Sequence, residues 1–225
     1  MELSNIYAYL IDLFKTIYPS FIETIYMVFF STLFATILGL PLGIILVITS
    51  KGHICENVKL NRILSTIVNI ARSVPFIILI IAIFPLSRII VGTTIGSTAA
   101  IVPLSIAACP FVARIVESCL LEVNWGIIEA SLSMGATTMQ IIFKVIIRES
   151  MPSLILGITL TIINILGYSA MAGAIGGGGL GDLAIRYGYQ RFQTDVLIAT
   201  ILVLIILVEI IQHTGNLLSK IFDKR

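Results

Sequence analysis

Five stretches without a charged residue constrain this chain more than any other feature. They cover residues 24–50, 73–87, 89–113, 150–181 and 196–208. A helix rises about 1.5 Å per residue and needs about twenty apolar residues to cross a hydrocarbon core about 30 Å thick. The first, third and fourth stretches reach that length by themselves. The other two reach it if Arg72 lies near an interface and Glu209 is tolerated inside a helix bundle. We therefore expect an integral membrane protein.

The composition supports this class. The chain is 58% hydrophobic and 12% charged, with a mean hydropathy of +1.08, whereas soluble domains are roughly 25% charged. The apolar runs are continuous, and barrel strands would alternate apolar and polar residues. The predicted fold class is therefore an all-α integral membrane protein with about five transmembrane helices in a single domain, residues 1–225. The expected spans are 22–49, 63–87, 89–113, 151–173 and 195–217.

The stretch before the first span is polar enough to lie outside the hydrocarbon. It runs to Tyr18 and carries Glu2, Asp12 and Lys15. It has neither a basic leader nor a small-residue cleavage site, so it is not expected to be a signal peptide. The sequence predicts an amphipathic helix at the membrane interface.

The basic residues predict the orientation, because cytoplasmic segments carry more Lys and Arg. One set of alternate segments holds Lys51, Lys59, Arg62, Arg114, Lys144, Arg148, Lys220, Lys224 and Arg225. The opposite set holds Lys15, Arg88, Arg186 and Arg191. We expect the N-terminus outside and the C-terminus in the cytoplasm. A net charge of +2 gives no nucleic-acid patch. The spacing of Cys55, Cys109 and Cys119 indicates neither a disulfide framework nor a zinc site.

A polar insert, approximately 117–147, separates the third and fourth expected spans. It lacks proline and is rich in helix-forming residues, so we expect one or two helices with breaks or turns at Asn124, Gly126 and Gly135. Two interpretations are open at this point. The insert is either an amphipathic loop helix or a knob that docks into a groove on a soluble partner.

The residues of this insert resemble the cytoplasmic signature of ABC-importer permeases. That pattern is Glu-Ala-Ala, three residues, Gly, nine residues, then Ile, any residue, Leu and Pro. The chain has Glu-Ala-Ser-Leu-Ser-Met-Gly at 129–135 and Val-Ile-Ile at 145–147. Ser131, Val145 and Ile147 are conservative departures, whereas Arg148 stands in the proline position and the next proline is Pro152.

Other stretches resemble one branch of that family, the bacterial methionine importers. They are Arg-Ser-Val-Pro-Phe at 72–76, Gly-Tyr-Ser-Ala-Met-Ala-Gly at 167–173 and Gly-Gly-Gly-Gly-Leu-Gly-Asp at 176–182. The resemblance implies a homodimeric channel in the bacterial inner membrane, with two ATP-binding subunits and an extracytoplasmic substrate-binding protein. ATP and Mg would be bound by the partner ATPase, and this chain would bind no cofactor. The resemblance assigns coupling to Glu129, Ala130, Ser131 and Gly135, and a candidate gate to Met171 with Ser169.

The residues themselves agree with several of these expectations. No Gly-x-x-x-x-Gly-Lys-[Ser/Thr] run occurs, so the chain does not hold nucleotide phosphates by a P-loop. Gly176, Gly178 and Gly181 spell G-x-G-x-x-G, but no strand precedes them, so irregular backbone is the better interpretation. Five helices make a poor pore, whereas two copies about a twofold axis enclose one. We name no catalytic and no metal-binding residue.

Alternatives remain for the activity and for single residues. The solute is methionine in either enantiomer, another small amino acid or a related compound. Gly-Tyr-Ser-Ala at 167–170 is close to the Gly-x-Ser-Gly of rhomboid-type proteases, although Ser169 and His213 are expected at different depths. A secondary transporter would show inverted repeats and ionisable groups inside the membrane. Arg72 either snorkels or faces the bundle, Glu209 and His213 either pair or line a path, and Met171 either packs or gates.

Overall fold

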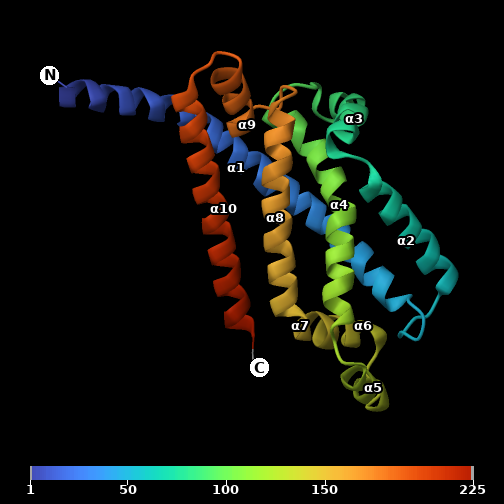
Figure 1. The fold of residues 1–225 in the computed structure, drawn as a ribbon. Helices are drawn as coiled ribbons and strands as arrows, with labels where there is room; N and C mark the ends of the chain where they lie inside the picture. Colours follow the sequence, from blue (N-terminus) through green and yellow to red (C-terminus); the bar gives the residue numbers. More distant parts are fainter. Residues whose placement is uncertain (1, 224–225) are drawn as a thin grey trace. The chain divides into compact units, whose positions relative to one another are not determined.

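The structure is a computed structural model that describes residues 2–223, and within that range it is helical without strands. The helices group into two compact units. The first unit contains the chain to Thr32, Phe76–Ser105 and Ile162–Ile210, and the second contains Leu33–Pro75, Ile106–Thr161 and the chain from Ile211. The four longest helices contribute residues to both units (Figure 1).

Four helices of the described chain are long and apolar enough to cross a membrane. They are α1 (Glu2–Ile48), α4 (Ser97–Leu121), α8 (Met151–Gly173) and α10 (Thr194–Phe222). A fifth span results if α2 (Val58–Ser73) and α3 (Phe76–Val91) are counted together as one broken span. The all-α membrane architecture predicted from the charge-free stretches is therefore present.

The expected second span, 63–87, is not one continuous helix. Helix α2 ends at Ser73, and Val74 adopts an extended conformation (φ −80°, ψ 124°) before α3 begins. The cause is Pro75, which has no backbone N–H to donate and disfavours helical geometry in the residue before it.

Three other helix boundaries differ from those expected. Helix α4 begins at Ser97 rather than 89, after a loop in which Gly92 and Gly96 have φ of +85° and +99°. It then runs to Leu121, so residues 117–121, expected in the insert, belong to this helix. At the N-terminus, the expected interfacial helix and first span are one uninterrupted helix, α1.

Glycines bring the helices of the second unit into backbone contact. A Cβ added to Gly39 of α1 would lie 2.7 Å from Val112 Cβ of α4, and one added to Gly43 would lie 2.7 Å from the Ala113 carbonyl oxygen. Gly157 of α8 instead leaves room for the side chain of Ile115 on α4. Small residues at helix crossings allow membrane helices to approach each other closely.

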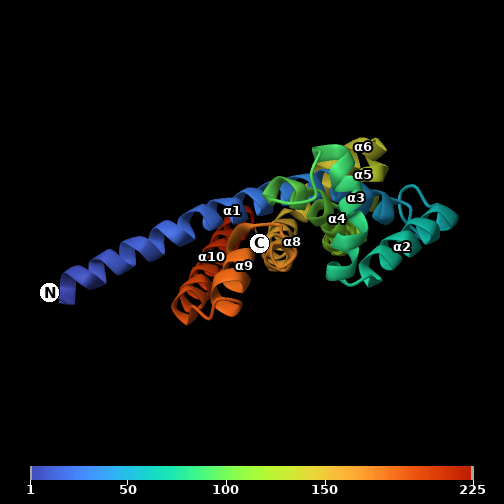
Figure 2. The ribbon, with the colours of Figure 1, turned by 90° about the horizontal axis from the view of Figure 1, so that it is seen from above.

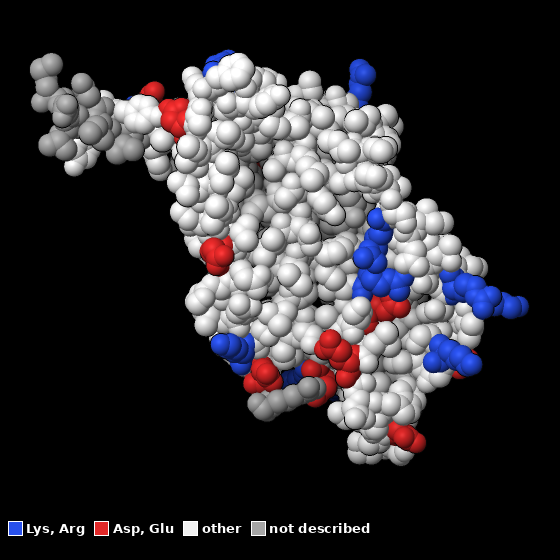
Figure 3. All heavy atoms as spheres, viewed as in Figure 1, with Lys and Arg blue, Asp and Glu red and all other residues white. Residues whose placement is uncertain are grey.

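Arg114 fastens α2 to α4 within this unit. Its Nη2 donates to Ser65 Oγ at 3.0 Å and to Asn69 Oδ1 at 2.7 Å, both on α2. Its Nη1 lies 2.6 Å from the Glu117 carboxylate, one turn along α4. Figure 3 shows Lys and Arg side chains gathered over α2, whereas most of the visible surface is uncharged. Two polar side chains of α2 are therefore paired with α4.

The first unit is organised around the glycine loop 176–179. Gly179 N–H donates to Glu23 Oε2 at 2.7 Å, and Leu180 N–H donates to Thr24 Oγ1 at 2.8 Å. These bonds hold the start of α9 (Gly179–Leu183) against α1. The π-helix η2 (Ala184–Tyr189) follows, and α9 lies beside the start of α10 in both ribbon views (Figures 1 and 2). The core here contains Ile17, Leu180, Leu183 and Val196.

Candidate functional site

The polar insert forms a short helix, α5 (Trp125–Ser133), with defined ends. Asn124 caps its start, because its Oδ1 accepts from Gly126 N–H at 2.8 Å. Gly135 N–H donates to the Leu132 carbonyl at 2.9 Å, and Ala136 N–H donates to the Ser131 carbonyl at 3.1 Å. Gly135 has φ +79°, a left-handed conformation that ends helices and favours glycine. The turn expected at Gly135 is present, whereas Gly126 lies inside the helix.

After this turn the chain returns to α8 without a flexible linker. Thr137 and Gln140 form a capping box at the start of α6 (Thr138–Gln140). The π-helix η1 (Ile141–Ile146) and α7 (Ile147–Glu149) continue from it. Figure 1 shows α5 beyond the end of α4 and α6 level with that end. The insert is therefore a projection of the second unit built from short helices joined by a turn.

The predicted coupling residues divide by exposure. Glu129, Ala130 and Gly135 are exposed, whereas Ser131 is buried and its Oγ donates to the Ile127 carbonyl at 2.8 Å. The buried face of α5 contains Ile128 and Ser131. The insert also exposes large apolar side chains, namely Trp125, Ile127, Leu132, Met134, Met139 and Phe143. Exposed aromatic, Met and aliphatic side chains gathered on one small projection are typical of a protein-binding surface.

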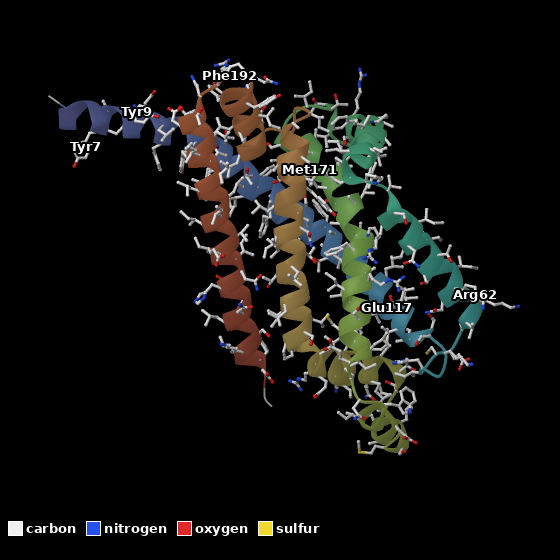
Figure 4. All side chains as sticks on the ribbon, in the orientation of Figure 1. Tyr7, Tyr9, Arg62, Glu117, Met171 and Phe192 are labelled. Atoms are coloured by element: carbon white, nitrogen blue, oxygen red, sulfur yellow. The ribbon has the colours of Figure 1, made fainter. Side chains whose placement is uncertain are left out.

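The candidate gate residues lie on α8, in the first unit. Met171 is 49% exposed, and Figure 4 shows it on this helix. Asn164 and Gly167 are exposed on the same helix, and Ala174 is exposed directly after its end, at spacings of three or four residues from one another or from Met171. A Cβ at Gly167 would have no neighbour within 4 Å. This face of α8 is therefore exposed in the single chain and carries small or polar residues beside Met171.

Ser169 is placed differently from Met171. Its side chain is buried, and its Oγ donates to the Leu166 carbonyl of its own helix at 2.7 Å. A serine held in this way is not presented as a nucleophile. The next side chain towards the N-terminus, Tyr168, stacks on Phe76 with ring centroids 4.5 Å apart. Ser169 and Tyr168 therefore support the helix that carries Met171.

The residues with open roles are also placed. Arg72 lies over the ring of Phe111, 5.9 Å from its centroid, so the apolar surroundings of this guanidinium include an aromatic face. Glu209 and His213 are both exposed on α10.

Sequence reasoning missed three contacts that shape the two units. These are the hydrogen bond from Gly179 N–H to Glu23, the hydrogen bonds from Arg114 to Ser65 and Asn69 (the Arg114 cluster), and the packing of His53 on Trp125. Each joins residues far apart in the chain, and only the position of the single tryptophan at the start of the insert was a visible signal.

The apolar helices and the helical projection with its exposed apolar side chains are those of a membrane permease that carries a surface for another protein. Residues 39–225 match the model of binding-protein-dependent transport system inner membrane components, and the chain belongs to this family.

Relatives and solved structures show which branch of this family the chain is similar to. The chain is 52% identical over 203 residues to the probable D-methionine transport system permease protein MetI of Vibrio cholerae, covering 90% of each. It is 50% identical over 181 residues to the methionine import system permease protein MetP of Bacillus subtilis, covering 80% of this chain and 82% of the relative. Its structure is similar to a chain of the MetNI methionine ABC transporter in an inward-facing conformation, with a TM-score of 0.89, 48% identity, and 90% and 94% coverage. A 20% identical chain of an amino acid ABC transporter shares the fold, with a TM-score of 0.71.

Proposed function

We propose that this chain is the permease subunit of an ATP-driven methionine importer, working as a homodimer with two ATP-binding subunits and an extracytoplasmic substrate-binding protein. The observation that carries the proposal is the exposed projection with Glu129, Ala130 and the turn at Gly135. The relatives named for methionine transport support the choice of solute.

In the proposed mechanism, ATP binding closes the partner subunits, and their motion reaches the spans through the insert. The turn at residues 134–137 joins α5 to α6, and η1, α7 and Ser150 continue from α6 to α8, so we expect a displacement of α5 to be passed to α8. The paired spans then expose the pathway to one side or the other. Nucleotide and Mg²⁺ chemistry belongs to the partner, since this chain has no P-loop sequence. No covalent intermediate forms, so no residue of this chain is catalytic.

Two further assignments belong to the proposal. The N-terminus lies outside and the C-terminus in the cytoplasm, because the segments containing the insert carry the larger share of basic residues. Met171 closes the pathway against its copy in the second permease chain. Support comes from its exposure on a face of small residues, where a flexible thioether can fill an irregular gap.

The test combines co-purification with transport. The tagged permease is expressed with the ATPase of a methionine importer, purified and placed in liposomes, and ATP-dependent uptake of labelled D- and L-methionine is measured against other apolar amino acids. Absence of a bound ATPase would contradict the permease assignment. Uptake of another amino acid with no uptake of methionine would overturn the choice of solute alone.

A substitution pair tests the docking surface. Gly135→Arg places a large charge in the turn and should abolish ATPase binding while the protein still inserts in the membrane. Gly92→Arg is the matched control, because Gly92 also has a positive φ (+85°) and open space around it. Full ATPase binding by Gly135→Arg would count against docking through residues 129–135.

A further inference from the structure

The loop between α1 and α2 is tied closely to the end of α1. Cys55 N–H donates to the Ile48 carbonyl at 2.9 Å, and Asn57 N–H donates to the Thr49 carbonyl at 3.0 Å. Gly52 N–H donates to Glu56 Oε2 at 2.9 Å across the tip of the loop. The loop is therefore anchored by hydrogen bonds to the end of α1.

One side chain of this loop reaches the insert. The ring of His53 meets the indole of Trp125, the first residue of α5, with centroids 5.5 Å apart and planes at 69°. This is the edge-to-face arrangement that aromatic rings prefer. His53 Nδ1 is buried without a hydrogen-bond partner among the described residues. Burial lowers the pKa of His53, so the ring is neutral at neutral pH. The contact is one of packing.

Helix α5 depends on such contacts for its orientation. It has 9 residues, and isolated helices shorter than about 12–15 residues are marginal in water. One side of α5 packs against η1, and the residues Ile128 and Ser131 of α5 are buried. The contact with His53 adds a second support at the start of the helix.

The contact with His53 connects α5 to α1, which is not the helix that α5 reaches through the rest of the insert. Beyond the loop lies α1, which is packed against α4 at Gly39 and Gly43. The other connection of α5, through η1 and α7, leads to α8. All of these contacts lie within the second unit.

We propose that His53 is a positioning residue for energy coupling, whose ring holds Trp125 so that a displacement of α5 is delivered to α1 as well as to α8. The inference rests on the proposed docking of an ATPase at residues 129–135. Loss of the ring would leave the ATPase bound and hydrolysing ATP but would disconnect one of the two helices that it must move.

The single tryptophan of the chain makes the contact directly measurable. In the purified full-length permease, His53→Ala should move Trp125 emission to longer wavelength and increase its quenching by acrylamide. His53→Phe keeps an aromatic ring and should match the wild type. Cys55→Ala, an exposed position in the same loop, is the control and should change neither signal.

The consequence for coupling is measured in liposomes with the ATPase. His53→Ala should bind the ATPase normally but hydrolyse at least threefold more ATP per methionine taken up, and His53→Phe should restore the wild-type ratio. His53→Gln, which keeps the size and polarity but has no aromatic ring, should behave as His53→Ala and serves if the alanine variant folds poorly.

The outcomes separate this inference from the proposed function. Wild-type emission and a wild-type coupling ratio in both His53→Ala and His53→Gln would overturn the role of His53. If Gly135→Arg abolishes ATPase binding in the same experiments, only the role of His53 has failed. If Gly135→Arg also binds the ATPase fully, the docking assignment itself has failed.

Discussion

At the scale of single residues, backbone conformation and side-chain exposure explain the candidate site better than charge does. Gly135 adopts a φ of +79°, which favours glycine, and the glycine that ends the Glu-Ala-x-x-x-x-Gly pattern predicted this turn. The same spacing did not reveal that Ser131 is buried, because its burial depends on how α5 packs against segments that follow it. For Met171, the sequence showed small neighbours, and the structure adds that its side chain is exposed.

A mild substitution at Gly135 should already weaken docking. Gly135→Ala forces a side chain into a left-handed conformation, which costs about 1–2 kcal/mol. If that cost falls on the docked state, affinity for the ATPase should fall by about 5- to 30-fold. Binding of the purified ATPase to the immobilised permease measures it. Gly92→Ala introduces comparable strain away from the insert and should bind normally; equal weakening in both variants would point to general destabilisation.

Truncating Met171 should open the closed pathway. If two Met171 thioethers seal the pathway as proposed, Met171→Ala leaves a void, so passive leak of methionine from liposomes should rise several-fold and ATP should be hydrolysed without matched uptake. Leu156→Ala, at a position 38% exposed on the same helix, is the control. Leak and uptake per ATP at wild-type values in Met171→Ala would exclude the gate while leaving the permease assignment intact.

At the scale of elements, the apolar stretches predicted the helices better than their ends. Length and hydropathy are local properties, so the sequence alone indicated an all-helical membrane protein. Helix ends depend on other causes. Pro75 breaks the second expected span, and Arg114 continues α4 beyond the charge-free stretch because Ser65 and Asn69 of α2 satisfy its guanidinium. Such pairings between distant residues leave no periodic signal.

The crossing of α1 and α4 gives a stability prediction. In Gly43→Leu, the new Cβ would lie 2.7 Å from the Ala113 carbonyl oxygen, so the two helices must separate. Overpacking costs about 1–3 kcal/mol, and the melting temperature in detergent should fall by about 2–12 °C.

Gly167→Leu provides the comparison, because a Cβ at Gly167 meets nothing within 4 Å. It should leave the melting temperature of the monomeric chain unchanged. If the exposed face of α8 contacts the second copy, this variant should lose the dimer on size exclusion. A lower melting temperature for Gly167→Leu with no change for Gly43→Leu would contradict the packing described for these glycines.

At the scale of the whole molecule, the distribution of basic residues predicts how the chain is inserted. The family places the chain in the inner membrane, and the Lys and Arg count adds which loops face the cytoplasm. The order of charges along a chain is visible in the sequence, whereas the partners that cover an exposed surface are not. For this reason the membrane class was predictable from the sequence, whereas the contact between His53 and the insert was not; the orientation stays a prediction.

Thiol labelling tests the orientation. Cys55 is exposed, Cys119 is buried and Cys109 is half-buried, and Cys109→Ala with Cys119→Ala leaves Cys55 as the single thiol. Cys55 should resist a membrane-impermeant maleimide in intact cells and react in inverted vesicles. Labelling in intact cells would reverse the assigned orientation, whatever the solute transported.

The Arg114 cluster also has a consequence for biosynthesis. Asn69 is made 45 residues before the guanidinium that it binds, which at about 5–20 residues per second is a delay of about 2–9 s. During that interval α2 has emerged from the ribosome with its polar face unmatched by α4. We expect the nascent α2 to wait at the membrane surface and to take its final place only after α4 has been inserted, so the chain completes its second crossing later than its sequence order implies.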